Sequence, residues 1–163
     1  AYAAWSGIRL LTEAEWECAA SWNESKQKRT FPWGKARMYQ RMDKLLRDMA
    51  KPNYRPPDLH PVDTPKGGAS AWGCLNMAGN ISEWVSDWYG PYPNEPQTNP
   101  TGPDAGPEKV YRGSEYVPAI TEARTTSRGS ARPETRVLRA GIRCASSPIF
   151  MTEVRLERYK LSL

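Results

Sequence analysis

The 163-residue sequence has few of the residues on which most metal and disulfide sites depend. It has one histidine, His60, and three cysteines, Cys18, Cys74 and Cys144, which are far apart and odd in number. No CxxC or paired Cys/His spacing occurs, which argues against zinc, haem and iron–sulfur sites. No apolar run approaches the ~20 residues of a membrane span. The chain opens without Met or a signal-like segment, as if from the middle of a longer protein.

Proline, glycine, tryptophan and tyrosine are abundant instead. The sequence has 15 Pro, 12 Gly, 7 Trp and 8 Tyr but only 2 Phe, which favours a loop-rich fold over a helical bundle. Its length favours one domain with a real core. The net charge of +5 permits an acidic partner without identifying one.

The segment from Asn76 to Tyr89 concentrates hard oxygen donors around one glycine. These donors are Asn76, Asn80, Glu83 and Asp87. Gly79 lets the backbone bend so that carbonyls can turn inward, and such a loop can wrap Ca²⁺. Trp84 and Trp88 would anchor the loop by burying their rings. The alternative is an Asx-rich turn with two core tryptophans and no metal.

The first third of the chain contains three helix signals. Ala1–Gly7 has the pattern of a helix end with Gly7 as terminator. Thr12 and Glu15 form a capping box, which predicts a helix over Glu13–Trp22 with Trp16, Ala19 and Ala20 toward the core. Lys35–Lys51 is a basic amphipathic pattern that can bind membranes, nucleic acid or acidic partners. A surface helix that packs its Met/Leu stripe on the domain is the favoured interpretation.

The remaining segments favour turns and short strands. Phe31–Gly34 is a turn with two rings, and Pro61–Asp63 is expected to enter a short strand. Composition alone makes the proline-rich Pro91–Pro107 a linker and a domain boundary. Val110–Ser114 predicts a strand and then a turn, and Ala140–Ala145 a buried strand.

The C-terminal third is rich in arginine. Arg124, Arg128, Arg132 and Arg136 have helical spacing, but Gly129 and Pro133 argue against a helix. The seven arginines from Arg112 to Arg143 can bind phosphate or an acidic peptide, or have a structural role. Ile149–Leu163 is either an edge strand or a docked tail.

Six segments in series resemble the sulfatase-modifying factor family, whose best-known member is the formylglycine-generating enzyme. Arg9–Glu17 is similar to its R-L-P-T-E-A-E-W-E segment, Phe31–Gly34 to its F/Y-P-W-G, and Leu75–Trp88 to its G-L-x-D/N-M-x-G-N-x-x-E-W-x-x-D-W core. The other three are Asn99–Pro103, Arg112–Ser114 and Gly141–Ala145, which match N-P-x-G-P, R-G-G-S and G-F-R-C-A.

The resemblance implies an irregular, loop-rich, C-type-lectin-like α+β fold with short antiparallel strands and few helices. It places a domain at residues 1–147, without the N-terminal part of the family domain, and a C-terminal extension at 148–163. It also makes Pro91–Pro107 an ordered surface loop instead of a linker.

The resemblance implies a Ca²⁺ site in the Asn76–Tyr89 segment. The family's ligands correspond to the side chains of Asn76 and Glu83 and to the carbonyls of Gly79 and Ile81, and all four positions suit the ion. The segment that holds a second family calcium is replaced here by the basic Lys35–Lys51 pattern.

The sequence departs from the family at its copper site. The family enzyme binds Cu(I) through two cysteines just after R-G-G-S, because soft thiolates suit a soft ion. Here Arg112–Ser114 is followed by Glu115–Glu122 without a cysteine, so we expect no copper and no formylglycine-generating activity. Ala3 and Ala20 stand where the animal enzymes have structural cysteines, so Cys144 is expected to be a free buried thiol.

Three functions follow. The first is a divergent or non-catalytic member that binds a ligand or protein. The second is an enzyme with altered, non-copper chemistry that uses carboxylates such as Glu115 or Glu122. The third is one chain of a heteromeric assembly. The candidate ligand-binding residues are Trp84, Trp88, Arg112, Glu115, Glu122, Arg124 and Arg128.

The expected partners are another polypeptide and a peptide or small-molecule ligand, but not nucleic acid. The polypeptide would cover an exposed apolar patch around Tyr2, Trp5 and Ile8, because the family places a further segment against the uncapped first helix. The compartment stays open: free thiols allow the cytoplasm, and the resemblance allows secretion or the periplasm.

Overall fold

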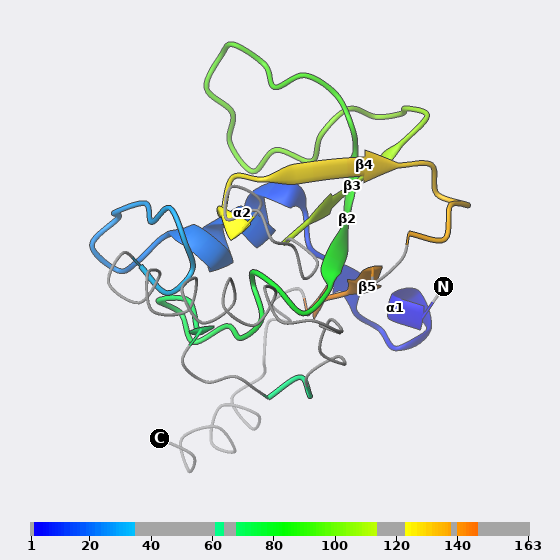
Figure 1. Ribbon diagram of the computed structural model, residues 1–163. Coiled ribbons are helices and arrows are strands. Elements are labelled where there is room, and N and C mark those ends of the chain that lie inside the picture. Colours follow the sequence, from blue (N-terminus) through cyan, green and yellow to red (C-terminus); the bar gives the residue numbers. More distant parts are fainter. Residues whose placement is uncertain (1, 35–60, 64–67, 114–122, 138–139, 147–163) are drawn as a thin grey trace, which may run out of the picture.

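The computed structural model describes residues 2–34, 61–63, 68–113, 123–137 and 140–146 of the chain (Figure 1). The helices are α1 (Tyr2–Trp5) and α2 (Glu13–Ser21). The strands are β1 (Arg9–Leu10), β2 (Ser82–Trp88), β3 (Lys109–Arg112), β4 (Arg128–Ala131), β5 (Ala140–Ile142) and β6 (Cys144–Ala145). The few helices, short strands and long loops confirm the predicted α+β class. No helix in these ranges is long and apolar enough to cross a membrane.

The strands form two sheets, and the larger one lies against α2. Its order is β4-β3-β2-β5, with antiparallel pairing of β3 to both β2 and β4. The pairing of β5 with β2 is parallel, which adds one parallel pair to the short antiparallel strands that were expected. β1 and β6 form the second sheet, which ties the start of the chain to its later part.

Both helices have the end signals that the sequence predicts. Gly7 has a φ of 69°, and the N–H groups of Gly7 and Ile8 bond to the carbonyls of Ala4 and Ala3 at 3.2 and 2.9 Å. This Schellman arrangement needs the left-handed conformation that glycine adopts without strain. At the start of α2, Thr12 Oγ1 accepts from the Glu15 N–H, and Glu15 accepts from the Thr12 N–H. The capping box is thus confirmed.

The core lies between α2 and the larger sheet. Trp16 and Ala20 of α2, Val85 of β2 and Val110 of β3 pack together with Met77 from the loop before β2. Gly113 follows β3 at a φ of 69°, and a Cβ there would lie 3.0 Å from the Trp16 ring. The close approach of this backbone to Trp16 therefore requires glycine.

The proline-rich segment 91–107 connects two paired strands of one sheet. The Tyr89 N–H bonds to the Glu108 carbonyl at 2.8 Å, which closes the base of the loop. Gly102 has a φ of 74° and packs against Asp87, where an added Cβ would come within 2.9 Å. The segment is the long green loop between β2 and β3 in Figure 1. It is an ordered surface loop, as the resemblance implies, and the linker that composition alone favoured is wrong.

Three other expectations need correction. Pro61–Asp63 is an exposed turn and not a strand, with Val62 86% exposed. The expected buried strand over Ala140–Ala145 is two short strands, and Ile142 is 47% exposed. The break falls at Arg143, which turns to bind Glu83 and the Leu75 carbonyl. Cys144 is a free thiol but only half-buried.

Several predicted features lie outside the described residues. They are the basic helix over Lys35–Lys51, the segment from Ser114 to Glu122 with Glu115, and the tail over Ile149–Leu163.

Candidate functional site

The oxygen-rich loop before β2 is strongly curled. Asn76, Gly79 and Asn80 have φ values of 57°, 86° and 74°, which turn successive carbonyls in different directions. Asn76 Nδ2 donates to the Val62 carbonyl at 3.1 Å, which orients the amide. Asparagine and glycine adopt this left-handed conformation most readily, so the sequence favours the curl.

Glu83, at the start of β2, is the buried carboxylate of this region. Its Oε2 accepts from Trp16 Nε1 at 2.7 Å and from Arg143 Nε at 2.8 Å. Its Oε1 accepts from Arg143 Nη2 at 2.7 Å, which makes the ion pair bidentate. Burial works to lower the pKa of Arg143, but the hydrogen bonds and attraction from Glu83 prevail and the pKa is raised.

A calcium ion at this loop would share Glu83 with Arg143. The donors that suit it in kind are the Asn76 amide oxygen, the carbonyls of Gly79 and Ile81, and Glu83 Oε1. Three of the roughly four lone-pair positions of the Glu83 carboxylate are already used, which leaves one at Oε1. No group of three or more acidic, cysteine or histidine residues gathers anywhere in the described ranges. All four donors are oxygens, the type that a hard cation prefers, and Arg143 would compete with such an ion for Glu83.

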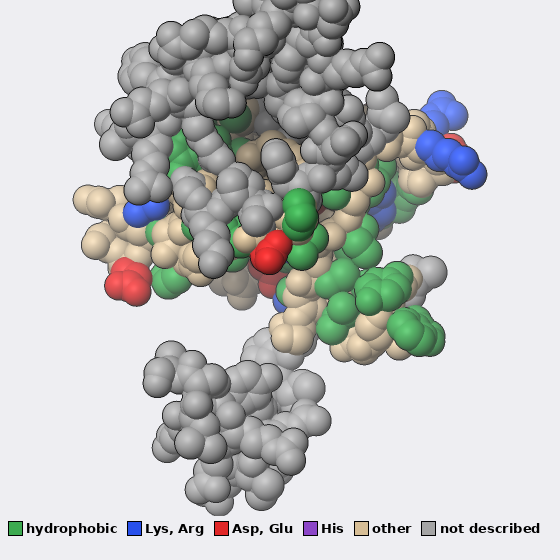
Figure 2. Space-filling view, turned by 60° about the horizontal axis from the view of Figure 1, so that its bottom comes forward, with side chains coloured by type: hydrophobic (Ala, Val, Ile, Leu, Met, Phe, Trp, Pro, Cys, Tyr) green, Lys and Arg blue, Asp and Glu red, His purple; other side chains and the backbone are tan. Residues whose placement is uncertain are grey.

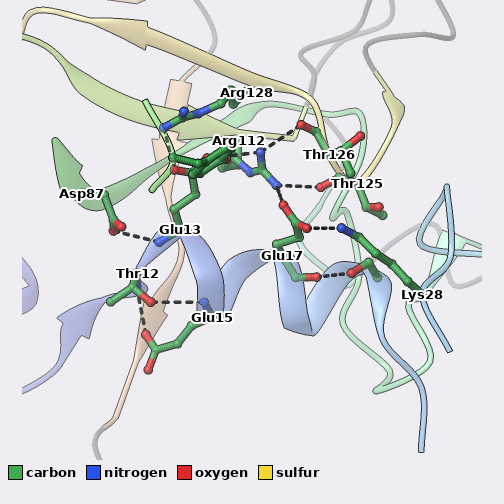
Figure 3. Close-up of polar contacts among 12 residues, drawn as sticks. Thr12, Glu13, Glu15, Glu17, Lys28, Asp87, Arg112, Thr125, Thr126 and Arg128 are labelled. Atoms are coloured by element: carbon green, nitrogen blue, oxygen red, sulfur yellow. Dashed lines mark hydrogen bonds and ion pairs between the residues drawn. The ribbon is translucent and has the colours of Figure 1, made fainter. Parts of the chain in front are cut away.

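Arg112, a candidate for ligand binding, is instead wholly enclosed by the protein, and Figure 3 shows its polar contacts. Its side chain has no exposed surface and contacts Glu13 at 3.2 Å and Glu17 at 2.5 Å. It also donates to the carbonyls of Thr125 and Thr126 at 2.7 and 3.2 Å. A buried guanidinium with two carboxylates connects α2 to β3 and to the turn before β4, and it offers no surface to a ligand.

Glu13 joins this network to the 91–107 loop. Its side chain accepts from Arg128 Nη2 and from the Tyr92 hydroxyl, both at 2.8 Å, and its N–H donates to Asp87 (Figure 3). The Arg128 guanidinium lies 4.5 Å from the Tyr89 ring centroid and 4.3 Å from that of Tyr92. Burial and then the bond to Glu13 raise the pKa of Tyr92 to about 12.

The other candidates differ in exposure. Arg124 is exposed in the turn before β4. Trp84 is half-buried and meets the Tyr111 ring edge-on, with centroids 5.5 Å apart. Trp88 is also half-buried, and Lys109 Nζ lies 3.9 Å from its ring centroid. Trp84 and Lys109 border the same groove.

This groove, of about 1410 Å³, runs between the outer side of α2, α1 and the 91–107 loop. Its lining includes Ala3, Ala4, Ile8 and Leu10 on one part and Trp84, Asn99, Pro100, Thr101 and Lys109 on another. On α1, whose Ala3 and Ala4 line the groove, Tyr2 and Trp5 are 60% and 83% exposed. Figure 2 shows a group of hydrophobic side chains at its lower right, on the side of the molecule where Figure 1 places α1. The exposure predicted for Tyr2 and Trp5 is therefore observed, whereas Ile8 is half-buried.

Sequence reasoning missed the groove and Lys109. Lys109 Nζ donates to the Ser86 carbonyl at 2.5 Å, and no described carboxylate lies within ion-pair distance. Burial lowers the pKa of Lys109, and attraction by Asp87 opposes the shift. Nothing in the sequence around Lys109 distinguishes it from a solvated lysine at the start of a strand.

The three cysteines lie on separate elements. Cys18 is exposed on α2, Cys74 is half-buried against the core, and Cys144 is half-buried in β6. All three are free thiols.

Comparison with known proteins gives one consistent family. The model of the sulfatase-modifying factor enzyme 1-like domain matches residues 1–148. A hercynine oxygenase of Mycolicibacterium smegmatis is 34% identical over 89% of this chain and 34% of its own length. The formylglycine-generating enzymes of Bos taurus and Streptomyces coelicolor are 33% and 32% identical over 90% of this chain. The chain spans 41% and 49% of those two relatives.

Two solved structures share the fold. Treponema denticola variable protein 1 aligns over 84% of this chain and 46% of its own, with a TM-score of 0.63 and 23% identity. PvdO from Pseudomonas aeruginosa aligns over 88% of this chain and 56% of its own, with a TM-score of 0.59 and 23% identity.

Proposed function

The chain belongs to the sulfatase-modifying factor family, and we propose that it is a ligand-binding member without copper-dependent oxidation chemistry. The observation that carries this proposal is the distribution of its thiols. The sequence has three cysteines, and none lies in Glu115–Glu122, the stretch directly after Arg112–Ser114 where the family's copper pair belongs. A Cu(I) ion needs soft thiolate ligands held close together. Cys18, Cys74 and Cys144 come instead from a helix surface, the core and a strand.

The ligand site in this proposal is the groove beside α2. It combines half-buried Trp84 with the Asn99–Thr101 segment and Lys109, which can orient a ligand around an apolar surface. Arg112 and Arg128 do not belong to this ligand site, because they form ion pairs with Glu13 and Glu17. Residues 1–147 form the binding domain, and 148–163 are an extension.

A calcium ion at Asn76, Gly79, Ile81 and Glu83 has a structural role in the proposal. The positive φ values of Asn76 and Gly79 and the remaining lone pair of Glu83 support it. Because Arg143 already neutralises Glu83, we expect the ion to bind weakly and to stabilise the loop without taking part in chemistry.

The test is incubation with Cu(I), O₂ and a cysteine-containing sulfatase-motif peptide. We expect the peptide mass to stay unchanged, because the chain has no thiolate pair to hold the metal. The formylglycine-generating enzyme of Streptomyces coelicolor serves as the active control. Conversion of the cysteine to an aldehyde by this chain would contradict the proposal.

A second candidate is an enzyme with altered, non-copper chemistry. It is favoured by the 34% identity to a hercynine oxygenase, whose name implies that it oxygenates hercynine. Glu115 and Glu122 would be its acid–base groups. Oxygen uptake with hercynine as substrate separates the two candidates, since a binding domain should consume none above background.

A third candidate is one chain of a heteromeric assembly. Tyr2 and Trp5 on α1 form an exposed apolar surface that another polypeptide could cover. Gel filtration and intact-mass measurement on protein from the native source distinguish a single chain from such an assembly.

A further inference from the structure

The groove beside α2 joins an apolar surface to one ammonium group. Ile8, Leu10, Pro100 and Ile142 contribute aliphatic surface, and Trp84 adds an aromatic ring. An apolar surface of this kind gains free energy when a ligand removes it from water. It therefore selects ligands with an extended apolar body.

The charged groups of the groove do not balance. Arg9 and Glu15 bind each other through two contacts of 2.6 and 2.7 Å, so their charges cancel. Lys109 has the Ser86 carbonyl and the Trp88 ring as direct partners, neither of which carries a formal charge, and Asp87 attracts it from beyond ion-pair distance. In the described part of the groove lining, Lys109 is thus the one cation without a carboxylate within ion-pair distance, and it attracts an anion.

The backbone of β2 argues against an extended peptide, and β1 and β5, which also line the groove, are edge strands of only two and three residues. A peptide that adds to a sheet needs unpaired N–H and C=O groups along a strand. β2, which contributes Trp84 to the groove, is central in the sheet and pairs with both β3 and β5. The Ser86 N–H donates to the Leu11 carbonyl, and the Ser86 carbonyl accepts from Lys109. These groups are already used.

We propose that the groove binds an elongated, mainly apolar small molecule with a single anionic group, which pairs with Lys109 Nζ. The apolar body lies along Leu10, Trp84 and Ile142. The groove, of about 1410 Å³, has room for a long ligand. The inference rests on the proposed ligand-binding function and names the class of ligand.

The test compares two ligands that differ only in charge. The fluorescent probe 8-anilinonaphthalene-1-sulfonate, an apolar anion, is bound to the protein and displaced by decanoate or by decanol at low salt. We expect decanoate to bind about fivefold more tightly than decanol, the effect of one partly screened ion pair. Raising the salt to about 0.5 M should remove most of this preference, because the Debye length shortens.

Matched variants locate the effect. Lys109→Gln should abolish the preference, so that decanoate and decanol bind about equally. Lys109→Arg should retain the preference because the charge is kept. Lys26→Gln is the control of equal net charge, since Lys26 is exposed and lies outside the groove lining. Circular dichroism in the aromatic region checks that each variant is folded.

Three outcomes of the comparison between decanoate and decanol overturn the inference. They are equal displacement by decanoate and decanol in the unaltered protein, an unchanged preference in a folded Lys109→Gln variant, and a preference that ignores salt. Displacement by an acidic, leucine-rich peptide but not by decanoate also overturns it and makes the groove a peptide site. The copper assay is independent, because conversion of the sulfatase-motif peptide contradicts the proposed function whatever the groove binds.

Discussion

The two sides of helix α2 use the same residue types for opposite purposes. On the inner side, Glu13 and Glu17 are committed to Arg112 and Arg128, and Trp16 is fully buried. On the outer side, Glu15 and Cys18 border the open groove, and the charge of Glu15 is matched by half-exposed Arg9. Glu13 and Glu15 are two positions apart, so the difference comes from what each side of the helix meets and not from local sequence. Inner charges hold the fold together, and outer groups remain available to a ligand.

The largest expected effect is loss of the inner carboxylate. Glu13→Ala leaves partly buried Arg128 without its acidic partner and fully buried Arg112 with one carboxylate instead of two. We expect the free energy of unfolding to fall by about 3 kcal/mol, because removing one member of a buried ion pair strands the other charge. Urea unfolding followed by fluorescence measures it.

The control for this variant is Glu24→Ala, which removes an exposed carboxylate beyond the end of α2. It should change the free energy of unfolding by less than about 0.5 kcal/mol. Equal effects of the two substitutions would show that the inner network contributes nothing to stability.

The second prediction concerns the proposed calcium site at Glu83. This carboxylate accepts a hydrogen bond from Trp16 on the inner side of α2. Chelation should lower the melting midpoint, because an ion that binds only the folded state stabilises it by about 1.4 kcal/mol at ten times its dissociation constant. Differential scanning fluorimetry with and without chelator measures the shift.

The matched variant for the calcium test is Asn76→Gly, which removes the amide oxygen but tolerates the positive φ of 57°. Its midpoint should not respond to chelator. A melting midpoint that does not move in the unaltered protein would contradict the calcium site and leave Arg143 as the only cation that binds Glu83.

The N-cap lies at the boundary between the two sides. Thr12→Ala removes the acceptor for the Glu15 N–H, so we expect a loss of about 1 kcal/mol in the free energy of unfolding. Thr12→Ser keeps the hydroxyl and should lose far less. If both variants lose the same amount, the methyl group and not the cap is responsible.

The smallest expected effect is the contribution of Glu15, on the outer side of α2, to the free energy of unfolding, and this contribution depends on pH. Hydrogen bonding by Arg9 is the main reason that the pKa of Glu15 is lowered. A lowered pKa in the folded state gives stability that is present above the unfolded value, about 4.3, and is lost as the pH falls through the folded value. The side chain is 42% exposed, so screening limits this to a few tenths of a kcal/mol.

The measurement is the free energy of unfolding from pH 7 to about pH 3 for the unaltered protein and for Glu15→Gln. We expect the advantage of the unaltered protein to shrink below about pH 4.3 and to be smaller in high salt. An advantage that grows on acidification would reverse the sign and exclude the Arg9 pair as its cause.

The local elements were predictable because their causes lie within a few residues. Gly7 ends α1, and Thr12 with Glu15 starts α2, since cap geometry depends only on neighbouring side chains and φ values. The partners of the arginines were not predictable. Arg112 and Arg128 were candidates for ligand binding, yet they pair with Glu17 and Glu13, which lie 95 and 115 positions away.

The sequence by itself determined the family, the ends of the helices, the absence of a cysteine pair after Ser114 and the curl of the Asn76–Glu83 loop. Each of these depends on residue identity at short range or on ordered motifs along the chain. Only the tertiary structure decided which charged side chains form ion pairs inside the protein and which face the groove. Lys109 and Arg112 end the same four-residue strand, but one borders open solvent near Trp84 while the other is enclosed between α2 and the sheet. Burial and pairing depend on what packs against each side chain, and that is set by segments far away in the sequence.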